Sequence, residues 1–178
     1  VGFGLGPNDE IPNDPLKWAT EQFNNVPKII WTGKIYKEKE LRKYYRDWVY
    51  NDRKVLRKKY KNDKTLYKVK KDQLRKDTGQ KFWESLEISI RHNEAINSQH
   101  PVFTKLWMFW GNFFAISEKD FLANYSTGPY QREIIRANMD QTFEKMVYEV
   151  TTSWAMIHHL DNSESAGPKS VTAREEWR

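Results

Sequence analysis

The sequence has 178 residues and a net charge of +6, and it contains no cysteine, which excludes a disulfide framework and a thiolate zinc site. Aromatic residues make up 15% of the chain and include 8 tryptophans, so we expect a folded protein with a substantial core. The longest apolar run, Leu106 to Ile116, is too short to cross a bilayer, and no transmembrane span is predicted. The chain starts at Val1 without a signal-peptide pattern, which leaves its localisation undetermined.

The positive charge is concentrated in one part of the chain. Between Lys34 and Lys81 there are 19 basic and 7 acidic residues, against 11 basic and 17 acidic residues in the rest of the sequence. Residues 34–81 are therefore predicted to form a basic segment within an otherwise acidic protein.

The first third of the chain is predicted to contain two helices after an irregular start. Residues 1–13 are rich in Gly, Pro, Asn and Asp, which favour turns. Asp14 followed by Pro15 is typical of a helix start, and the short helix should end within residues 24–33. From Lys37 to about Tyr60, apolar residues recur in steps of three and four, which predicts a helix with cations on its other face.

The middle of the chain is predicted to hold two further helices and the core helix. Weaker helical spacing runs from Thr65 to Lys76, and a clearer pattern runs from Gln80 to Asn97. Pro101 after His100 favours a new helix start. The stretch from about 102 to 116 is apolar nearly all round, which predicts a buried helix at the centre of the fold.

The last third contains several predicted helix starts. They are the capping pair Ser117 and Asp120, the Gly128–Pro129 dipeptide before residues 130–138, and Ser170 or Thr172. Asn138 to about Leu160 is predicted to form one helix or a pair. No segment shows period-two alternation bounded by hairpin turns, so the predicted fold is all-α: a single domain over residues 1–178, built as an irregular multi-helix bundle around the 102–116 helix.

The basic segment combines cations with tyrosine and tryptophan, as nucleic-acid contacts require. The rings lie at core-facing helical spacing, however, so for the segment taken by itself a solvated cationic face is favoured over contact with an anionic partner. The sequence leaves three anionic partners open: nucleic acid, lipid headgroups or an acidic protein. The predicted anion-binding residues are Arg53, Lys54, Arg57, Lys58 and Lys61.

A second candidate site lies near the end of the chain. His158 and Asp161 are three residues apart and can share a helix face, so the imidazole could act as a general base or metal ligand oriented by the carboxylate. With Asn162 they are the candidate catalytic residues. The same residues also describe a helix C-terminus and its turn, and this structural interpretation is favoured because spacing places no third metal ligand or nucleophile. No metal site or cofactor is predicted.

Four segments resemble, in order, the amino-terminal part of the bacterial family called domain of unknown function 1800. They are VGFGLGP from Val1, LWMFWGNFFAIS from Leu106, TGPYQREIIRANM from Thr127 and TTSWAMIHHLDNSESAGPKS from Thr151. The resemblance implies a helical bacterial protein whose relatives are often exported or located at the cell surface. It implies no activity, since the activity of the family is unknown.

The chain also departs from the family pattern. Four of its characteristic positions hold other residues here: Phe113 replaces a histidine, Ser153 and Trp154 replace a His-Pro pair, and His159 replaces a tyrosine. The family pattern continues with an Asn-Glu-Asn and Glu-Leu-His segment that this sequence lacks, so we expect an incomplete family domain. The basic segment 34–81 matches no family motif and is expected to be an insertion or an elaboration.

Three functional hypotheses follow. The first is a non-catalytic helical binding domain whose cationic face, within residues 34–81, contacts an anionic partner. The second is one half of a hydrolase, with or without a metal ion, in which Asp161, Asn162 and His158 face a cavity. The third is a decayed remnant without activity. The sequence leaves open whether the protein is an enzyme, because no complete catalytic constellation is present.

Overall fold

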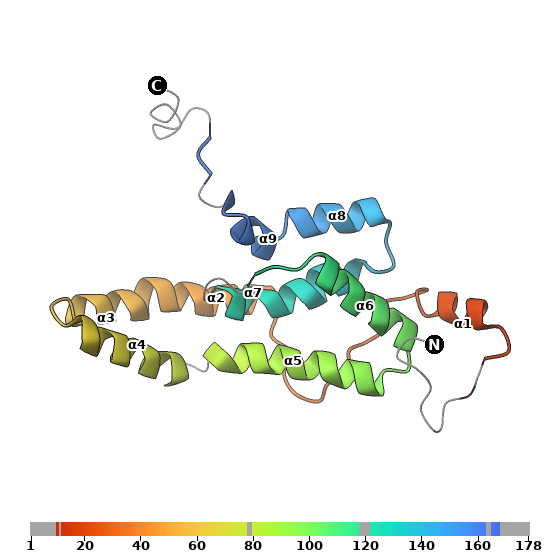
Figure 1. The fold of residues 1–178 in the computed structure, drawn as a ribbon, viewed down its shortest axis with the longest axis horizontal. Coiled ribbons are helices and arrows are strands. Elements are labelled where there is room, and N and C mark those ends of the chain that lie inside the picture. The colour runs from red at the N-terminus through yellow and green to blue at the C-terminus, as the bar shows by residue number, and fades with distance from the viewer. Residues whose placement is uncertain (1–9, 11, 78–79, 118–121, 163–164, 168–178) are drawn as a thin grey trace.

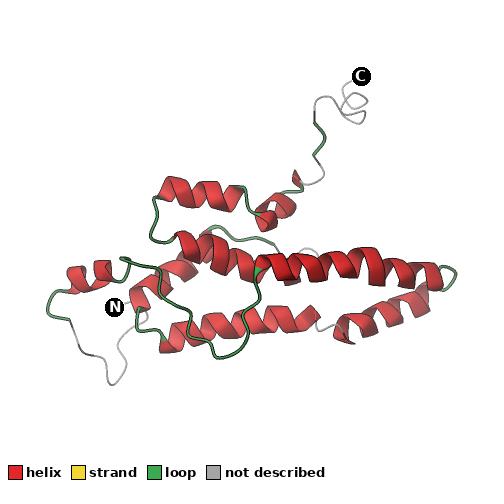
Figure 2. Ribbon diagram, turned by 180° about the vertical axis from the view of Figure 1, so that it is seen from behind, coloured by secondary structure: helices red, strands yellow, loops and turns green. Residues whose placement is uncertain are grey.

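The computed structural model describes residues 10, 12–77, 80–117, 122–162 and 165–167, and within these residues the regular structure is helical, without a β-strand (Figure 1, Figure 2). The prediction of an all-α fold is therefore confirmed. The α-helices are α1 (Pro15–Glu21), α2 (Glu38–Asp47), α3 (Arg53–Lys59), α4 (Lys64–Asp77), α5 (Gln80–Asn97), α6 (Pro101–Phe113), α7 (Ala123–Pro129), α8 (Phe143–Thr151) and α9 (Trp154–His159). Three shorter helical segments connect some of them: the π-helical η1 (Trp48–Asp52) and η2 (Tyr130–Ile135), and the 3₁₀-helical η3 (Arg136–Asn138).

Several helices form where their local sequence signals predict them. The Asp14 carboxylate accepts a hydrogen bond from the Lys17 N–H at 3.0 Å, which confirms the predicted cap of α1. The helix predicted from Lys37 to Tyr60 forms as a continuous rod of α2, η1 and α3, which lies in the left half of the molecule in Figure 1. Within η1 the helix widens by one residue, because the Arg53 N–H donates to the Trp48 carbonyl five residues earlier.

The core consists of two clusters of buried side chains. The larger cluster is formed by Phe103, Trp107, Tyr130, Ile135, Met139, Met146, Val150 and Ala155. The smaller cluster is formed by Leu41, Trp83 and Tyr125. Because α6 supplies two fully buried rings to the larger cluster, the prediction that this helix occupies the core is confirmed.

The outer face of α6 differs from the prediction of a helix buried on all sides. Phe109 and Phe113 are 52% and 62% exposed, and the helix ends at Phe113 rather than near residue 116. Their rings stack with a centroid distance of 6.2 Å. The apolar pattern around α6 is thus divided between a buried face and an exposed aromatic face, a distinction that composition alone does not make.

The Gly128–Pro129 dipeptide does not begin a helix, contrary to the prediction. Pro129 is the last residue of α7, and the chain continues without interruption into η2 and η3. Gly128 is buried, and a Cβ atom there would collide with the side chain of Glu87. The glycine therefore permits close helix packing, whereas the local sequence signal predicted a helix start.

Other predicted features are confirmed or lie beyond the described residues. The region from Asn138 to Leu160 contains the helix pair α8 and α9, and the Gln80–Asn97 helix forms with the predicted bounds. Most of the irregular segment predicted at residues 1–13, Asp120 of the capping pair, and the alternative starts Ser170 and Thr172 lie outside the described residues. In the described part of the chain, no helix combines the length and apolar character needed to cross a membrane.

Candidate functional site

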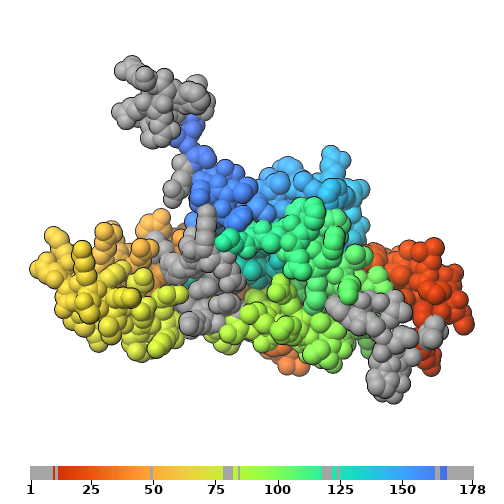
Figure 3. Space-filling view, viewed as in Figure 1, coloured from red at the N-terminus to blue at the C-terminus, as the bar shows by residue number. Residues whose placement is uncertain are grey.

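The α3–α4 hairpin projects from one end of the molecule, away from both core clusters (Figure 1, Figure 3). Neither helix contains a buried residue. Between the two helices the chain makes a tight turn in which the Asp63 N–H donates to the Tyr60 carbonyl at 3.2 Å. The hairpin is therefore an exposed element whose side chains are available for contacts outside the domain.

The turn is held by caps on both helices. The Tyr60 N–H donates to the Leu56 carbonyl at 3.0 Å and ends α3. The Asp63 carboxylate accepts a hydrogen bond from the Leu66 N–H at 2.8 Å and caps the start of α4. These contacts fix the direction in which α4 runs back along α3.

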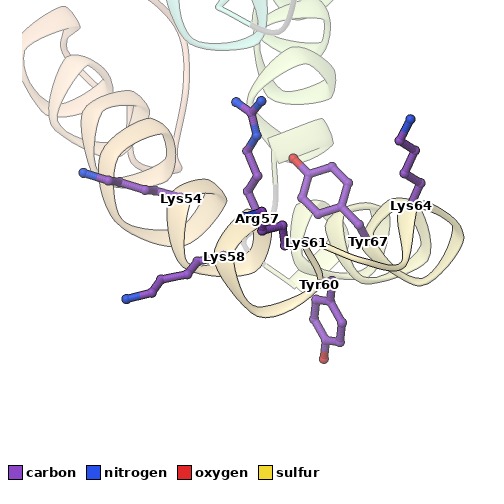
Figure 4. A pocket seen from close by; sticks show the side chains of 7 residues that line it. All are labelled: Lys54, Arg57, Lys58, Tyr60, Lys61, Lys64 and Tyr67. Carbon is purple, nitrogen blue, oxygen red and sulfur yellow. The ribbon is translucent and has the colours of Figure 1, made fainter.

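A groove of about 760 Å³ lies at this hairpin, and Figure 4 shows the side chains that line it. Its lining contains five cations and two tyrosines, and all five cations are exposed. The lining residues are Lys54, Arg57, Lys58, Tyr60, Lys61, Lys64 and Tyr67. No carboxylate is among them, so the side chains at the groove give it positive potential.

Helical spacing explains why the cations gather. Lys54, Arg57, Lys58 and Lys61 follow one another in steps of three, one and three, so they share one side of α3 and the turn that follows. The partly negative carbonyl end of α3 stabilises cations in its last turn. Lys64 then adds a fifth charge from the first turn of α4.

Four of the five predicted anion-binding residues line the groove, whereas Arg53 is not among the lining residues. Arg53 is exposed at the start of α3. Helical spacing did not predict Lys64, Tyr60 and Tyr67 as parts of the same site. Periodicity could place residues on one helix, but only the folded hairpin brings the start of α4 beside the end of α3.

The second candidate site lies at the end of α9. Asp161 has a backbone φ of 57°, in the left-handed region, and its N–H donates to the His158 carbonyl at 3.0 Å. Asp161 and Asn162 are exposed, and His158 is half-buried. The backbone geometry is that of a helix C-terminus. The assignment of these three residues as catalytic stays a prediction.

A small cavity adjoins this helix end. Its volume is about 10 Å³, enough for roughly one water molecule. Its lining includes His158, His159 and Ser126, and the Ser117 N–H donates to the His159 Nδ1 at 3.1 Å. The cavity is too small for a substrate.

Two buried arginines form a further polar cluster, which no sequence pattern predicted. Arg132 makes two hydrogen bonds of 2.8 Å to the Glu87 carboxylate and a third, of 2.7 Å, to the Tyr36 carbonyl. One helical turn later, Arg136 pairs with Glu94 at 3.5 Å, and Glu94 also accepts the Ile30 N–H at 2.5 Å. These contacts join η2 and η3 to α5 and to the loop before α2.

The surroundings of the second pair are aromatic. The Arg136 guanidinium lies 5.3 Å from the ring centre of Phe103 and 5.4 Å from that of Trp107. Burial lowers the pKa of Arg136, and the Glu94 carboxylate opposes this change. The Trp107 indole N–H donates to the Gln131 carbonyl at 2.7 Å, which ties α6 to the same segment. This cluster therefore stabilises the packing of four helical elements, η2, η3, α5 and α6.

Metal ligands do not converge in the described part of the chain. No group of three or more His, Asp or Glu residues there is arranged to hold a metal ion.

The fold and its sites define a class: a helical domain with buried Arg–Glu pairs and an exposed cationic hairpin. The family model described as "Protein of unknown function (DUF1800)" matches residues 1–176, and the chain belongs to this family. The resemblance recognised in the sequence is thereby confirmed. No curated protein and no solved structure matches the chain.

Two of the segments that resemble the family contribute to the buried cluster. Trp107 belongs to the segment that starts at Leu106, and Arg132 and Arg136 belong to the segment that starts at Thr127. The structure thus gives these motif residues a role in packing, while the cationic groove lies outside the resembling segments.

Proposed function

We propose that this protein acts as a non-catalytic helical binding domain and that the groove of the α3–α4 hairpin holds an anionic partner. The observation that carries the proposal is the gathering of five exposed cations around one groove that has no carboxylate in its lining. In the described part of the chain, the five cations of the groove form no ion pair with a carboxylate.

Some exposed cations elsewhere in the described part of the chain have carboxylate partners. Lys34 lies 2.8 Å from Glu40, and Lys145 lies 2.5 Å from Glu149. In both pairs the hydrogen bond to the carboxylate raises the pKa of the lysine. The groove cations differ from these paired lysines. The acidic residue nearest to them in sequence is Asp63, and its carboxylate caps α4.

Gathering like charges without counter-charges is electrostatically unfavourable, and a bound anion would relieve the repulsion. The groove is exposed, so mobile salt ions provide part of this relief in the free protein. A polyanion would displace several of these ions at once, and the entropy of their release favours association. This explains how a hairpin without a buried core residue can serve the protein through its charge.

The proposal is tested by titrating the purified 178-residue chain with labelled RNA, DNA and anionic vesicles at low and at raised salt. We expect binding to at least one of these polyanions, with an affinity that falls steeply as salt rises. Binding to none of them at low salt would refute the proposed function.

Arg57 and Arg53 provide a matched pair of substitutions on the same helix. Arg57→Gln removes a charge from the groove lining, whereas Arg53→Gln removes the same charge from a residue outside that lining. We expect Arg57→Gln to weaken binding and to reduce the slope of log K against log salt by about 1. Arg53→Gln should have a clearly smaller effect on both. Equal effects would show that net charge, rather than the groove, determines binding.

A further inference from the structure

The groove contains aromatic rings as well as charges. Tyr60 and Tyr67 both line it, and both are half-buried, so part of each ring is accessible to a ligand. In Figure 4 the side chains of Arg57 and Tyr67 point to the same side of the hairpin, whereas Tyr60 points to the opposite side. Arg57 comes from α3 and Tyr67 from α4, so the folded hairpin is what combines a cation and a ring on one side.

We propose that the anionic partner is a single-stranded nucleic acid. Its phosphates would contact the lysines and Arg57, and one of its bases would stack on the ring of Tyr67. This inference rests on the proposed function and specifies its ligand. Grooves that bind single strands without sequence preference combine cations that follow the phosphate backbone with rings on which bases stack.

A membrane surface fits the hairpin less well. The most exposed apolar residues of the two helices are Val55 and Val69, at 64% and 57% exposure, and Leu66 is 38% exposed. Residues 53–77 contain no tryptophan, phenylalanine or isoleucine. Helices that bind membranes insert large apolar side chains between the lipids, and a concave groove does not follow a flat bilayer. The groove fits a flexible chain better than it fits a surface.

A double helix would use the charges but not the ring. In a duplex the faces of the bases are stacked on one another, so a tyrosine at the surface cannot stack on them without unpairing a base. A phosphate polymer without bases would likewise contact only the cations. The contribution of Tyr67 therefore separates a single strand from the other polyanions.

The test measures binding of the full chain to four ligands at low salt: a short single-stranded oligothymidylate, a duplex of the same length, inorganic polyphosphate of similar charge, and phosphatidylserine vesicles. We expect the single strand to bind most tightly. Tyr67→Leu should weaken binding of the single strand about 5- to 100-fold and leave polyphosphate binding unchanged, since base stacking on a ring contributes affinities of this order. Tyr67→Phe, which keeps the ring, should bind the single strand like the wild type.

The other outcomes of this test overturn either the inference or the proposed function. If Tyr67→Leu binds the single strand as well as the wild type does, or loses polyphosphate binding to the same extent, the inference is wrong. It is also wrong if vesicles, duplex or polyphosphate bind more tightly than the single strand, although the proposed function then stands. Retained polyphosphate binding by the Tyr67→Leu variant shows that the hairpin is still folded. Absence of binding to all four ligands refutes the proposed function itself.

Discussion

Arg132 and Glu87 form a two-pronged ion pair in which Nε and Nη2 each lie 2.8 Å from a carboxylate oxygen. The guanidinium side chain is only 4% exposed, and that of Glu87 is 13% exposed. The pair joins η2 to α5 across 45 positions of the sequence. Because both charges are removed from water, each depends on the other for its stabilisation.

Replacing one partner of this pair should therefore destabilise the fold strongly. Glu87→Gln leaves the buried Arg132 charge with only the Glu133 carboxylate, 3.6 Å away, as a counter-charge, and we expect the free energy of unfolding to fall by about 3 kcal/mol. Urea denaturation measures the change. Glu149→Gln, which breaks an exposed pair with Lys145, is the control and should leave the urea midpoint nearly unchanged. Similar losses in the two variants would contradict the importance of burial.

Gly128 provides a second test of the same contact. A Cβ atom at this position would collide with Cγ and Cδ of Glu87, and Gly128→Ala would push that carboxylate away from Arg132. In an open helical position alanine is about 1 kcal/mol more favourable than glycine, so the sign of the effect is informative. We expect Gly128→Ala to lower the free energy of unfolding by about 1–3 kcal/mol.

Gly167→Ala is the matched control for this substitution. A Cβ atom at Gly167 meets no other atom within 4 Å, so no loss of stability is expected there. If Gly128→Ala were as stable as the wild type, Glu87 could move without cost and the ion pair would not constrain the packing of α7 on α5.

The sequence could predict where helices form but not which distant residues they contact. Apolar spacing predicted the helix from Gln80 to Asn97 with its observed bounds, because local periodicity and caps determine a helix. The same spacing could not predict that Glu94, within that helix, is 1% exposed. Its burial depends on Arg136 and on the Ile30 N–H, which are distant in sequence.

The candidate groove shows the same limit. Lys54, Arg57, Lys58 and Lys61 could be placed together because they lie on one helix and its end. Tyr67 could not be assigned to the site, since its position depends on how α4 folds back. The exposed ring of Phe109 was also unpredictable, because the apolar pattern of α6 does not show which face remains uncovered.

Glu133 should make stability depend on pH. Its carboxylate accepts the Glu38 N–H at 3.0 Å, and desolvation raises its pKa above the ordinary value of 4.5 although Arg132 acts in the opposite direction. A raised pKa means that the folded state favours the protonated acid. The stabilisation of the folded state by this raised pKa is fully present below about pH 4.5, the pKa of the same carboxyl in the unfolded chain. It is lost as the pH rises through the folded-state pKa.

Glu133→Gln removes this titration while keeping an oxygen that can accept the Glu38 N–H. At pH 7 we expect the variant to be at least as stable as the wild type, and its advantage should shrink as the pH is lowered toward 4.5. Thermal denaturation at a series of pH values measures this difference. The opposite result would be a variant that is less stable than the wild type at neutral pH and loses this disadvantage at acidic pH. That result would show that the attraction of Arg132 outweighs the desolvation of Glu133.

Asp161 allows the helix-end and catalytic interpretations to be compared. Its φ of 57° favours glycine or asparagine and is strained for alanine. If the residue serves the end of α9, Asp161→Gly should be at least as stable as the wild type, Asp161→Asn should be similar to it, and Asp161→Ala should lose about 1 kcal/mol.

The order of the three variants in urea denaturation decides between the interpretations. Backbone geometry alone predicts the order Gly, Asn, Ala from most to least stable. A carboxylate retained for chemistry commonly costs stability, so Asn and Ala would then both be more stable than the wild type. That result would direct attention back to Asp161, Asn162 and His158 as a site, whereas the expected order assigns Asp161 to the turn that follows α9.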